Sequence, residues 1–198
     1  MLVFLLVEGH LERDHLASFL RRAVDALEGH GLRVGKMRNY RRVGPATKAA
    51  TEMYGADAVF ALFDLKGFPG VQGQSGTPAH RARWLKGQLI SVVPSEYREK
   101  FHPHVAVHEL EAWILADKSR LTELGLTGLP AGDPEDVNFT AGPKGRLAER
   151  WRLAKGRGYQ EVIDGARLLQ EIDPQVVRNG CPHFRAFITD LERTLKGE

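Results

Sequence analysis

The sequence predicts an α/β protein: a mainly parallel sheet flanked by helices, with a helical C-terminal part. Two short apolar runs, at 2–7 and 58–63, have the length of strands that are covered on both faces. Segments with apolar residues at helical spacing separate the expected strands, as in βαβ units. From residue 118 onward the pattern is helical, with no convincing strand.

The N-terminal part alternates strands and helices. In chain order, we expect strands at 2–7, 32–40, 58–63 and 105–107, and helices at 16–27, 47–54, 79–93 and 108–116. Gly29 and Gly31 end the first of these helices. The segment 67–78 is rich in glycine and proline, which predicts a loop after the third strand.

The C-terminal part contains three expected helices. One follows Gly142-Pro143, and apolar spacing predicts two more at 159–169 and 184–195. We place a soft boundary near residue 117. It divides an α/β core, 1–117, from a helical subdomain, 118–198, that packs on the core.

Composition excludes several classes of protein. The 198 residues carry a net charge of +3, which is too weak by itself to indicate nucleic-acid binding. A single cysteine, Cys181, excludes an internal disulfide framework and a cysteine-rich zinc site. No window reaches the ~20 apolar residues of a membrane span. Residues 2–7 lack a preceding basic region, so we interpret them as a strand and expect a cytoplasmic protein.

Carboxylates follow both of the clear strands. Glu8 comes directly after the first strand and Asp64 after the third, and ligands of parallel sheets bind beyond the carboxyl ends of strands. Gly9 permits close approach of a ligand to the backbone. Two such carboxylates repel each other unless a cation neutralises them, and oxygen ligands suit Mg²⁺ or Mn²⁺. Alternatively, Glu12 only favours a helix N-terminus, and Asp64 only begins a turn.

A third group of polar residues follows the expected strand at 105–107. Here His108, Glu109 and Glu111 lie close together in sequence, and Glu109 is expected near Glu8 and Asp64. The spacing is not that of a zinc protease, because a second histidine is missing. We expect Glu109 to act as a metal ligand and Glu111 to assist, although a lone histidine such as His108 is more often structural.

Several basic residues are candidates for phosphate contacts. Lys66 follows Asp64 by two residues, and either binds a phosphate or pairs with Asp64. Lys144, Arg146 and Arg150 share one expected helix, where phosphate binding competes with the commoner role of solvated helix charges. Arg41-Arg42 and Lys86 are further basic candidates, without a specific assignment.

Six short motifs occur in a fixed order along the chain. They are Val7-Glu8-Gly9-x-x-Glu12, Phe63-Asp64, His108-Glu109-Leu110-Glu111-Ala112, Pro134-Glu135-x-Val137-Asn138, Pro143-Lys144-x-Arg146-Leu147 and Cys181-Pro182-His183-Phe184. Together they resemble domain-of-unknown-function family 4276, a bacterial TOPRIM-like family, over nearly the whole chain.

The resemblance implies the Mg²⁺-binding fold of topoisomerases, primases and overcoming-lysogenization-defect nucleases. In those proteins a glutamate after the first strand and an Asp-x-Asp after a later strand serve metal binding and phosphoryl chemistry. Glu8 matches the glutamate and Asp64 the first aspartate, whereas Lys66 stands in place of the second. Relatives of this kind occur beside ABC-like or AAA-type ATPases in bacterial defence loci, which implies an ATPase partner.

The leading hypothesis is therefore a Mg²⁺- or Mn²⁺-dependent nuclease or phosphodiesterase that acts on nucleic acid, with DNA as the expected substrate. Glu8, Asp64 and Glu109 would hold the metal, while Lys66 or His108 would contact the scissile phosphate or take part in proton transfer. The alternative is an inactive TOPRIM-like module that docks onto an ATPase or DNA, which the Lys66 departure favours. A third hypothesis, nucleotide binding of the Rossmann type, has weak support, because no GxGxxG follows the first strand.

Overall fold

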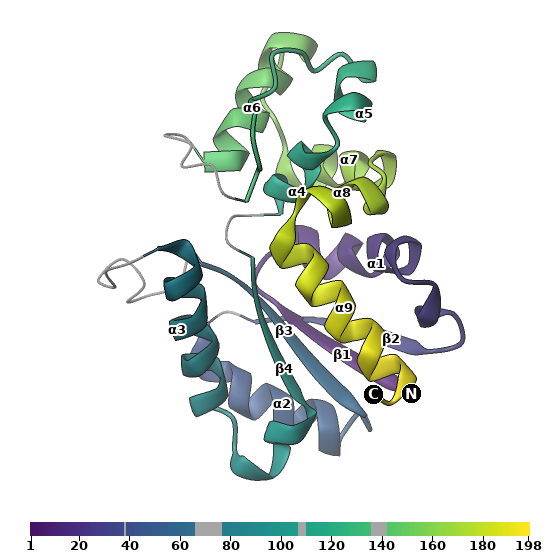
Figure 1. Cartoon of the computed structure of the whole chain (residues 1–198), viewed down its shortest axis with the longest axis vertical. Coiled ribbons are helices and arrows are strands. Elements are labelled where there is room, and N and C mark those ends of the chain that lie inside the picture. The colour runs from purple at the N-terminus through teal and green to yellow at the C-terminus, as the bar shows by residue number, and fades with distance from the viewer. Residues whose placement is uncertain (38, 66–76, 107–109, 136–141) are drawn as a thin grey trace.

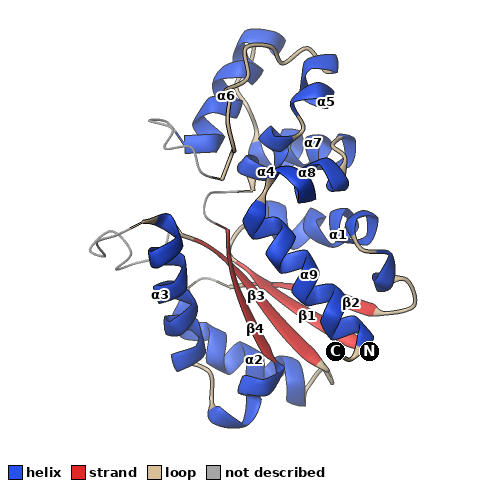
Figure 2. Cartoon of the chain, in the orientation of Figure 1, coloured by secondary structure: helices blue, strands red, loops and turns tan. Residues whose placement is uncertain are grey.

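A four-stranded parallel sheet forms the centre of the α/β part of the protein (Figures 1 and 2). The computed structural model describes residues 1–37, 39–65, 77–106, 110–135 and 142–198. The strands are β1 (Leu2–Val7), β2 (Gly31–Lys36), β3 (Ala58–Asp64) and β4 (Phe101–Ala106), and their order in the sheet is β2-β1-β3-β4.

The order of the strands reverses its direction between β1 and β3. The chain leaves β1 toward β2 on one side, and it leaves β3 toward β4 on the other. In parallel sheets such a switch point opens a crevice at the carboxyl ends of the two central strands, which is where ligands bind. This topology makes the residues that end β1 and β3 the natural place for a site.

Helices cover both faces of the sheet (Figure 1). On one face, α2 (Val43–Glu52) and α3 (Pro78–Ser91) bury alternate residues of β3, including Val59, Ala61 and Phe63. On the other face, α1 (Ala17–Ala23) and α9 (Pro182–Lys196) cover Phe60 and Leu62 of the same strand. Because both faces are buried, β3 is an almost continuous apolar run that ends at the charged Asp64.

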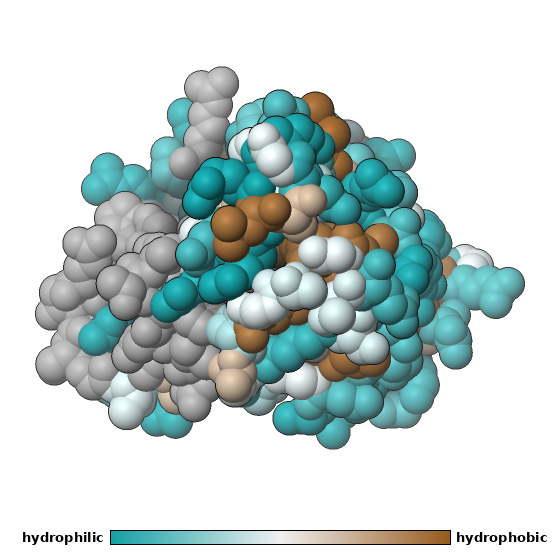
Figure 3. Space-filling model, turned by 90° about the horizontal axis from the view of Figure 1, so that it is seen from above, coloured by the Kyte–Doolittle hydropathy of each residue, from teal (hydrophilic) through white to brown (hydrophobic). Residues whose placement is uncertain are grey.

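From residue 111 onward, all regular elements that the structure describes are helices. They are α4 (Glu111–Ala116), α5 (Lys118–Glu123), α6 (Gly142–Lys155), the short η6 (Glu161–Gly165), α7 (Ala166–Glu171), α8 (Pro174–Gly180) and α9. Figure 3 looks down on the end of the molecule that contains α5 and α6. Its surface is mainly hydrophilic, with apolar patches between polar side chains.

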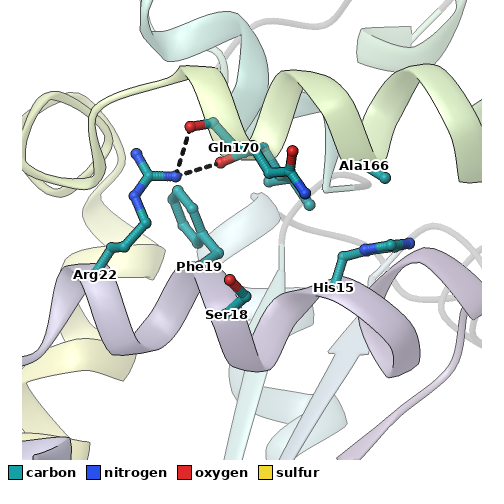
Figure 4. A pocket seen from close by; sticks show the side chains of 7 residues that line it. His15, Ser18, Phe19, Arg22, Ala166 and Gln170 are labelled. Carbon is teal, nitrogen blue, oxygen red and sulfur yellow. Dashed lines mark hydrogen bonds between the residues drawn. The ribbon is translucent and has the colours of Figure 1, made fainter.

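Arg22 fastens these helices to α1. Its guanidinium donates hydrogen bonds to the backbone carbonyls of Leu169 and Gln170, both at 2.9 Å (Figure 4). It also donates to the carbonyl of Ile172 at 2.6 Å. The pocket beside it holds only about 10 Å³ and is too small for an organic ligand. Arg22 therefore satisfies carbonyl groups at the end of α7 that the helix itself leaves unpaired.

The fold class and most of the expected elements are confirmed, with corrections to several of their bounds. The first helix ends at Ala23 and not at Leu27, because Val24 is extended, and Leu27 is buried from a separate short helix, η2 (Asp25–Leu27). The last strand begins at Phe101, four residues before the expected start at 105.

The extension of β4 includes Pro103, which pairs with Ala61 of β3. Proline lacks a backbone donor, but β4 is an edge strand, so no further strand needs that donor. The sequence pattern predicted a strand only at 105–107.

Several boundaries shift by a few residues. The second strand ends at Lys36 and not at Tyr40, because Tyr40 begins the short helix η3 (Tyr40–Arg42). The following helix, α2, begins four residues before the expected start at 47. The expected loop at 67–78 lies almost wholly outside the described residues, and Pro78 begins α3.

The predicted division at residue 117 stays a prediction. One apolar cluster contains Val3 and Leu5 of β1 together with Phe184 and Phe187 of α9, so the expected core and the C-terminal helices share buried surface. In the parts of the chain that the structure describes, no helix is long and apolar enough to cross a membrane.

Candidate metal and phosphate site at the carboxyl edge of the sheet

Glu8 and Asp64 lie together at the switch point of the sheet. Val7, which ends β1, pairs with Leu62 of β3, so Glu8 lies beside the end of β3. The backbone N–H of Asp64 donates a hydrogen bond to Oε2 of Glu8 at 2.9 Å. The structure thus brings together the two carboxylates that follow the clear strands, and it fixes one of them in place.

The environment of Glu8 disfavours its charged form. Burial raises its pKa to about 7, and repulsion from Asp64 and Glu12 adds to this effect, although the hydrogen bond from Asp64 opposes it. A cation bound here would favour the charged form of Glu8, because it would offset both the desolvation and the repulsion.

Glu12 folds back over the backbone of Gly9. A Cβ added at Gly9 would lie 1.9 Å from Oε2 of Glu12, so only glycine leaves room for this position of the carboxylate. Oε2 of Glu12 is buried and has no hydrogen-bond partner among the described residues. A buried oxygen without a partner is costly, and a bound cation or water would satisfy it.

Charges from three other elements act on Glu12. Burial raises its pKa and its own backbone N–H lowers it; Glu161 of η6 raises it further, and Lys144 of α6 and Lys36 of β2 lower it. The C-terminal helices therefore contribute charged groups to this edge of the sheet. Lys36 and Glu161 were missed by sequence reasoning, although Lys36 ends a strand just as Val7 does, and that position is a usable signal.

A small pocket joins the three carboxylates. Glu8, Glu12 and Asp64 line it together with Ala106 at the end of β4 and Leu110 before α4, and its volume is about 20 Å³. This is roughly the space that one water molecule needs. The pocket is therefore of a size for a small ion or a water molecule and not for an organic cofactor.

Glu111 is the buried member of the third predicted group. It begins α4, and its Oε1 lies 3.5 Å from the hydroxyl of Tyr159. Burial and the neighbouring carboxylates Glu111 and Glu161 raise the pKa of Tyr159, so this hydroxyl keeps its proton and serves as a donor. Lys66, His108 and Glu109 lie outside the described residues, and their predicted roles stay predictions.

The donor set fits a hard divalent cation in chemistry but is not a closed ligand shell. All candidate donors are carboxylate oxygens, which Mg²⁺ and Mn²⁺ prefer, and the buried Oε2 of Glu12 lacks a partner among the described residues. Within those same residues, no three His, Cys, Asp or Glu side chains are grouped closely enough to hold a metal ion. Glu8 and Asp64 would supply ligands, and at least one more donor is required.

The three basic residues predicted for phosphate contacts face carboxylates of the chain itself. Lys144 donates to the carboxylate of Glu161. Arg146 and Arg150 lie 3.9 and 3.8 Å from Oε2 of Glu149. Their assignment to phosphate stays a prediction, and any phosphate would compete with these ion pairs.

Fold and site together define an α/β protein with carboxylates at the switch point of a parallel sheet. A family profile described as Domain of unknown function (DUF4276) matches residues 7–192, and the chain belongs to this family. Among solved structures, the chain is similar to the C-terminal region of the Burkholderia pseudomallei OLD protein. Sequence identity is 15%, the alignment covers 94% of this chain and 98% of the other, and the TM-score is 0.48. A search of the curated proteins found no match.

Proposed function

We propose that the protein is a divalent-metal-dependent phosphodiesterase that acts on nucleic acid, that is, a nuclease of the TOPRIM-like class. One observation carries the proposal: Asp64 at the end of β3 holds the carboxylate of Glu8 at the switch point of the parallel sheet. The raised pKa of Glu8 and the unpartnered oxygen of Glu12 support it, because both are relieved by a cation.

Glu8 and Asp64 would hold Mg²⁺ or Mn²⁺, with Glu12, Glu109 or Glu111 completing the set. When bound, such an ion supplies charge stabilisation on a phosphate and lowers the pKa of a bound water. The protein's own part is to fix the carboxylate of Glu8 through the amide of Asp64 and to place Glu12 over Gly9.

The test is cleavage of plasmid and single-stranded substrates in Mn²⁺ and in EDTA. The Glu8→Gln/Asp64→Asn double variant removes two negative charges at the site and should abolish metal-dependent cleavage. Its matched control is Asp25→Asn/Glu28→Gln, which removes the same charges from an exposed turn before β2. Metal-dependent cleavage that survives in the first variant would overturn the proposal.

A second candidate function is a binding module without catalysis. It is favoured by the lack of a three-residue metal-binding group among the described residues, and by Lys66 in place of a second aspartate. Calorimetry with Mg²⁺ separates the two functions. An acidic site that binds no metal at millimolar concentration supports the binding module, whereas binding that disappears in Glu8→Gln/Asp64→Asn supports the nuclease.

An ATPase partner, with a role in bacterial defence or DNA maintenance, is part of the same proposal and depends on the family resemblance. It predicts that the protein changes the ATPase rate of an ABC-like or AAA-type partner. An unchanged rate together with no binding in calorimetry would contradict the proposed partnership.

A further inference from the structure

A second, larger pocket lies at the carboxyl end of β2. Its volume is about 550 Å³, and it is lined by Lys36, Met37, Asn39, Arg42, Pro45 and Ala46. Lys36 ends β2, Met37 and Asn39 lie between β2 and η3, Arg42 ends η3, and Pro45 and Ala46 belong to α2. No acidic residue is among them, so the lining combines two cations with an amide and apolar surface.

Among the described residues the two cations are not held in ion pairs, although the charge of Lys36 lowers the pKa of Glu12. In the part of the chain that the structure describes, neither Lys36 nor Arg42 forms an ion pair or a side-chain hydrogen bond, whereas Arg120, Arg157 and Arg178 all pair with carboxylates. The first turn of α2 also carries no acidic residue and no side-chain cap. Its partial positive charge therefore adds to that of the two side chains.

The pocket adjoins the carboxylates of the switch point. Lys36 pairs in register with Val7, and the backbone N–H of Met37 donates to the carbonyl of Val7 at 2.6 Å. Glu8 is the next residue along the chain. Cations and carboxylates thus lie side by side on the same edge of the sheet, one strand apart.

We propose that this pocket binds a phosphate of a nucleic-acid backbone, so that the strand continues along the sheet edge to Glu8 and Asp64. The inference rests on the proposed function and identifies where its substrate is held. Lys36 and Arg42 contact the phosphate oxygens. Met37, Pro45 and Ala46 give an apolar surface for the attached sugar or base, which inorganic phosphate and polyglutamate lack.

The experiment measures binding of a short fluorescein-labelled single-stranded DNA oligonucleotide by anisotropy in EDTA, at several salt concentrations. The test variant is Lys36→Ala/Arg42→Ala. The matched control is Arg193→Ala/Lys196→Ala, which removes two exposed charges near the end of α9, beside the N-terminus (Figure 1). Circular dichroism checks that both variants are folded.

We expect the test variant to bind about tenfold more weakly than the control, with a salt slope reduced by roughly 1.4, the value for two lost single-strand phosphate contacts. Lys36→Arg/Arg42→Lys should restore binding. Equal affinity of the test and control variants would overturn the inference. So would displacement of the oligonucleotide by inorganic phosphate or by polyglutamate at the same charge concentration.

The outcome is separable from that of the proposed function. Glu8→Gln/Asp64→Asn should still bind the oligonucleotide in EDTA. Binding that depends on Lys36 and Arg42 without any metal-dependent cleavage would uphold the pocket and overturn the nuclease. Metal-dependent cleavage that is unchanged in Lys36→Ala/Arg42→Ala would uphold the nuclease and overturn the pocket.

Discussion

At the scale of single residues, the site depends on the absence of a side chain at Gly9. The Glu12 carboxylate occupies the space that a Cβ at this position would need. A glycine after a strand is common for reasons of backbone freedom. Here the described contacts give it a second role, because it lets Glu12 lie beside Glu8 in the small pocket.

Gly9→Ala should therefore weaken Mn²⁺ binding by about tenfold, the usual effect of disturbing a supporting group at a metal site. Stability should change by no more than about 1 kcal/mol, since Glu12 is flexible and can move away. Calorimetry with Mn²⁺ and thermal unfolding measure the two effects. The control is Gly87→Ala in α3, where the added Cβ meets nothing within 4 Å. Unchanged Mn²⁺ affinity in Gly9→Ala would contradict this role.

Glu8→Gln should stabilise the metal-free protein at alkaline pH. A carboxyl group with a raised pKa favours folding below its unfolded value of 4.5, and loses that contribution as the pH rises through about 7. Glutamine never ionises, so the variant avoids the loss. We expect a gain of about 1–2 kcal/mol in the free energy of unfolding above pH 7, allowing for partial exposure, and no difference below pH 4.5.

Urea unfolding in EDTA across this pH range measures the gain, with Glu28→Gln as the exposed control. If Glu8→Gln were less stable than wild type at pH 8, the fold would favour the charged form of Glu8, and this prediction would be wrong.

At the scale of elements, α9 is fastened to the edge strand β4 by a polar cluster. Oδ2 of Asp190 lies 3.2 Å from Nδ1 of His102 and 2.8 Å from Nε2 of His104. His102 stacks on Phe60 with ring centroids 4.4 Å apart. Lys86 of α3 also acts on this group, and Asp190 opposes the lowering of the pKa of Lys86 by burial.

The cluster makes stability depend on pH. Burial alone would raise the pKa of Asp190, but hydrogen bonds from His102 and His104 lower it well below its usual value. Burial lowers the pKa of His104, against the effect of Asp190. The two shifts change stability with pH in the same direction. Each group stabilises the fold above its unfolded pKa, 6.5 for His104 and 3.8 for Asp190, and this stabilisation is lost as the pH falls.

Asp190→Asn should lower the free energy of unfolding at pH 7 by about 1 kcal/mol, a value discounted because the side chain is 38% exposed. The difference from wild type should shrink as the pH falls below 3.8, where Asp190 begins to lose its charge advantage. Urea unfolding over a pH series measures it, with Asp25→Asn as the control. A constant difference at every pH would mean that shape and not charge decides the effect.

At the scale of the whole molecule, the α/β part and the C-terminal helices bury their surfaces in common. Phe184, Phe187 and Ile188 of α9 belong to the same apolar cluster as Val3 and Phe60 of the sheet. Without α9, one face of the sheet would expose large apolar side chains to water.

We therefore expect a single cooperative unfolding transition for the full chain, and no native-like tertiary signal from residues 1–117 alone. Near-ultraviolet circular dichroism and thermal unfolding measure both. A chain that lacks only Gly197 and Glu198 is the control, since these residues are exposed. A separate cooperative transition of the fragment 1–117 would show that the core folds by itself.

Much of the fold could be predicted from local pattern. The apolar run at 2–7 and the run at 58–63 form buried strands, because a strand covered on both faces has no polar position. The placement of Glu8 and Asp64 at strand ends follows from the same pattern. Their proximity required only that β1 and β3 be neighbours.

The predicted ends of strands and helices were wrong where long-range contacts determine them. β4 begins at Phe101 because β3 offers a hydrogen-bonding partner, and this partner is invisible in the segment His102-Pro103-His104. In the same way, Leu27 has the spacing of a helix residue and is buried, yet it belongs to a separate turn after the extended Val24. Burial periodicity predicts which residues face the core, and not whether one helix carries them all.

The sequence by itself determined the α/β class, the buried strands and the carboxylates at their ends, because these depend on residues that are adjacent in the chain. Only the tertiary structure decided the fold of Glu12 over Gly9, the approach of Glu161 and Lys144, and the pocket at Lys36 and Arg42. The reason is physical. Side-chain positions and the pairing of charges depend on distances between segments far apart in sequence, and packing sets those distances only once the chain has folded.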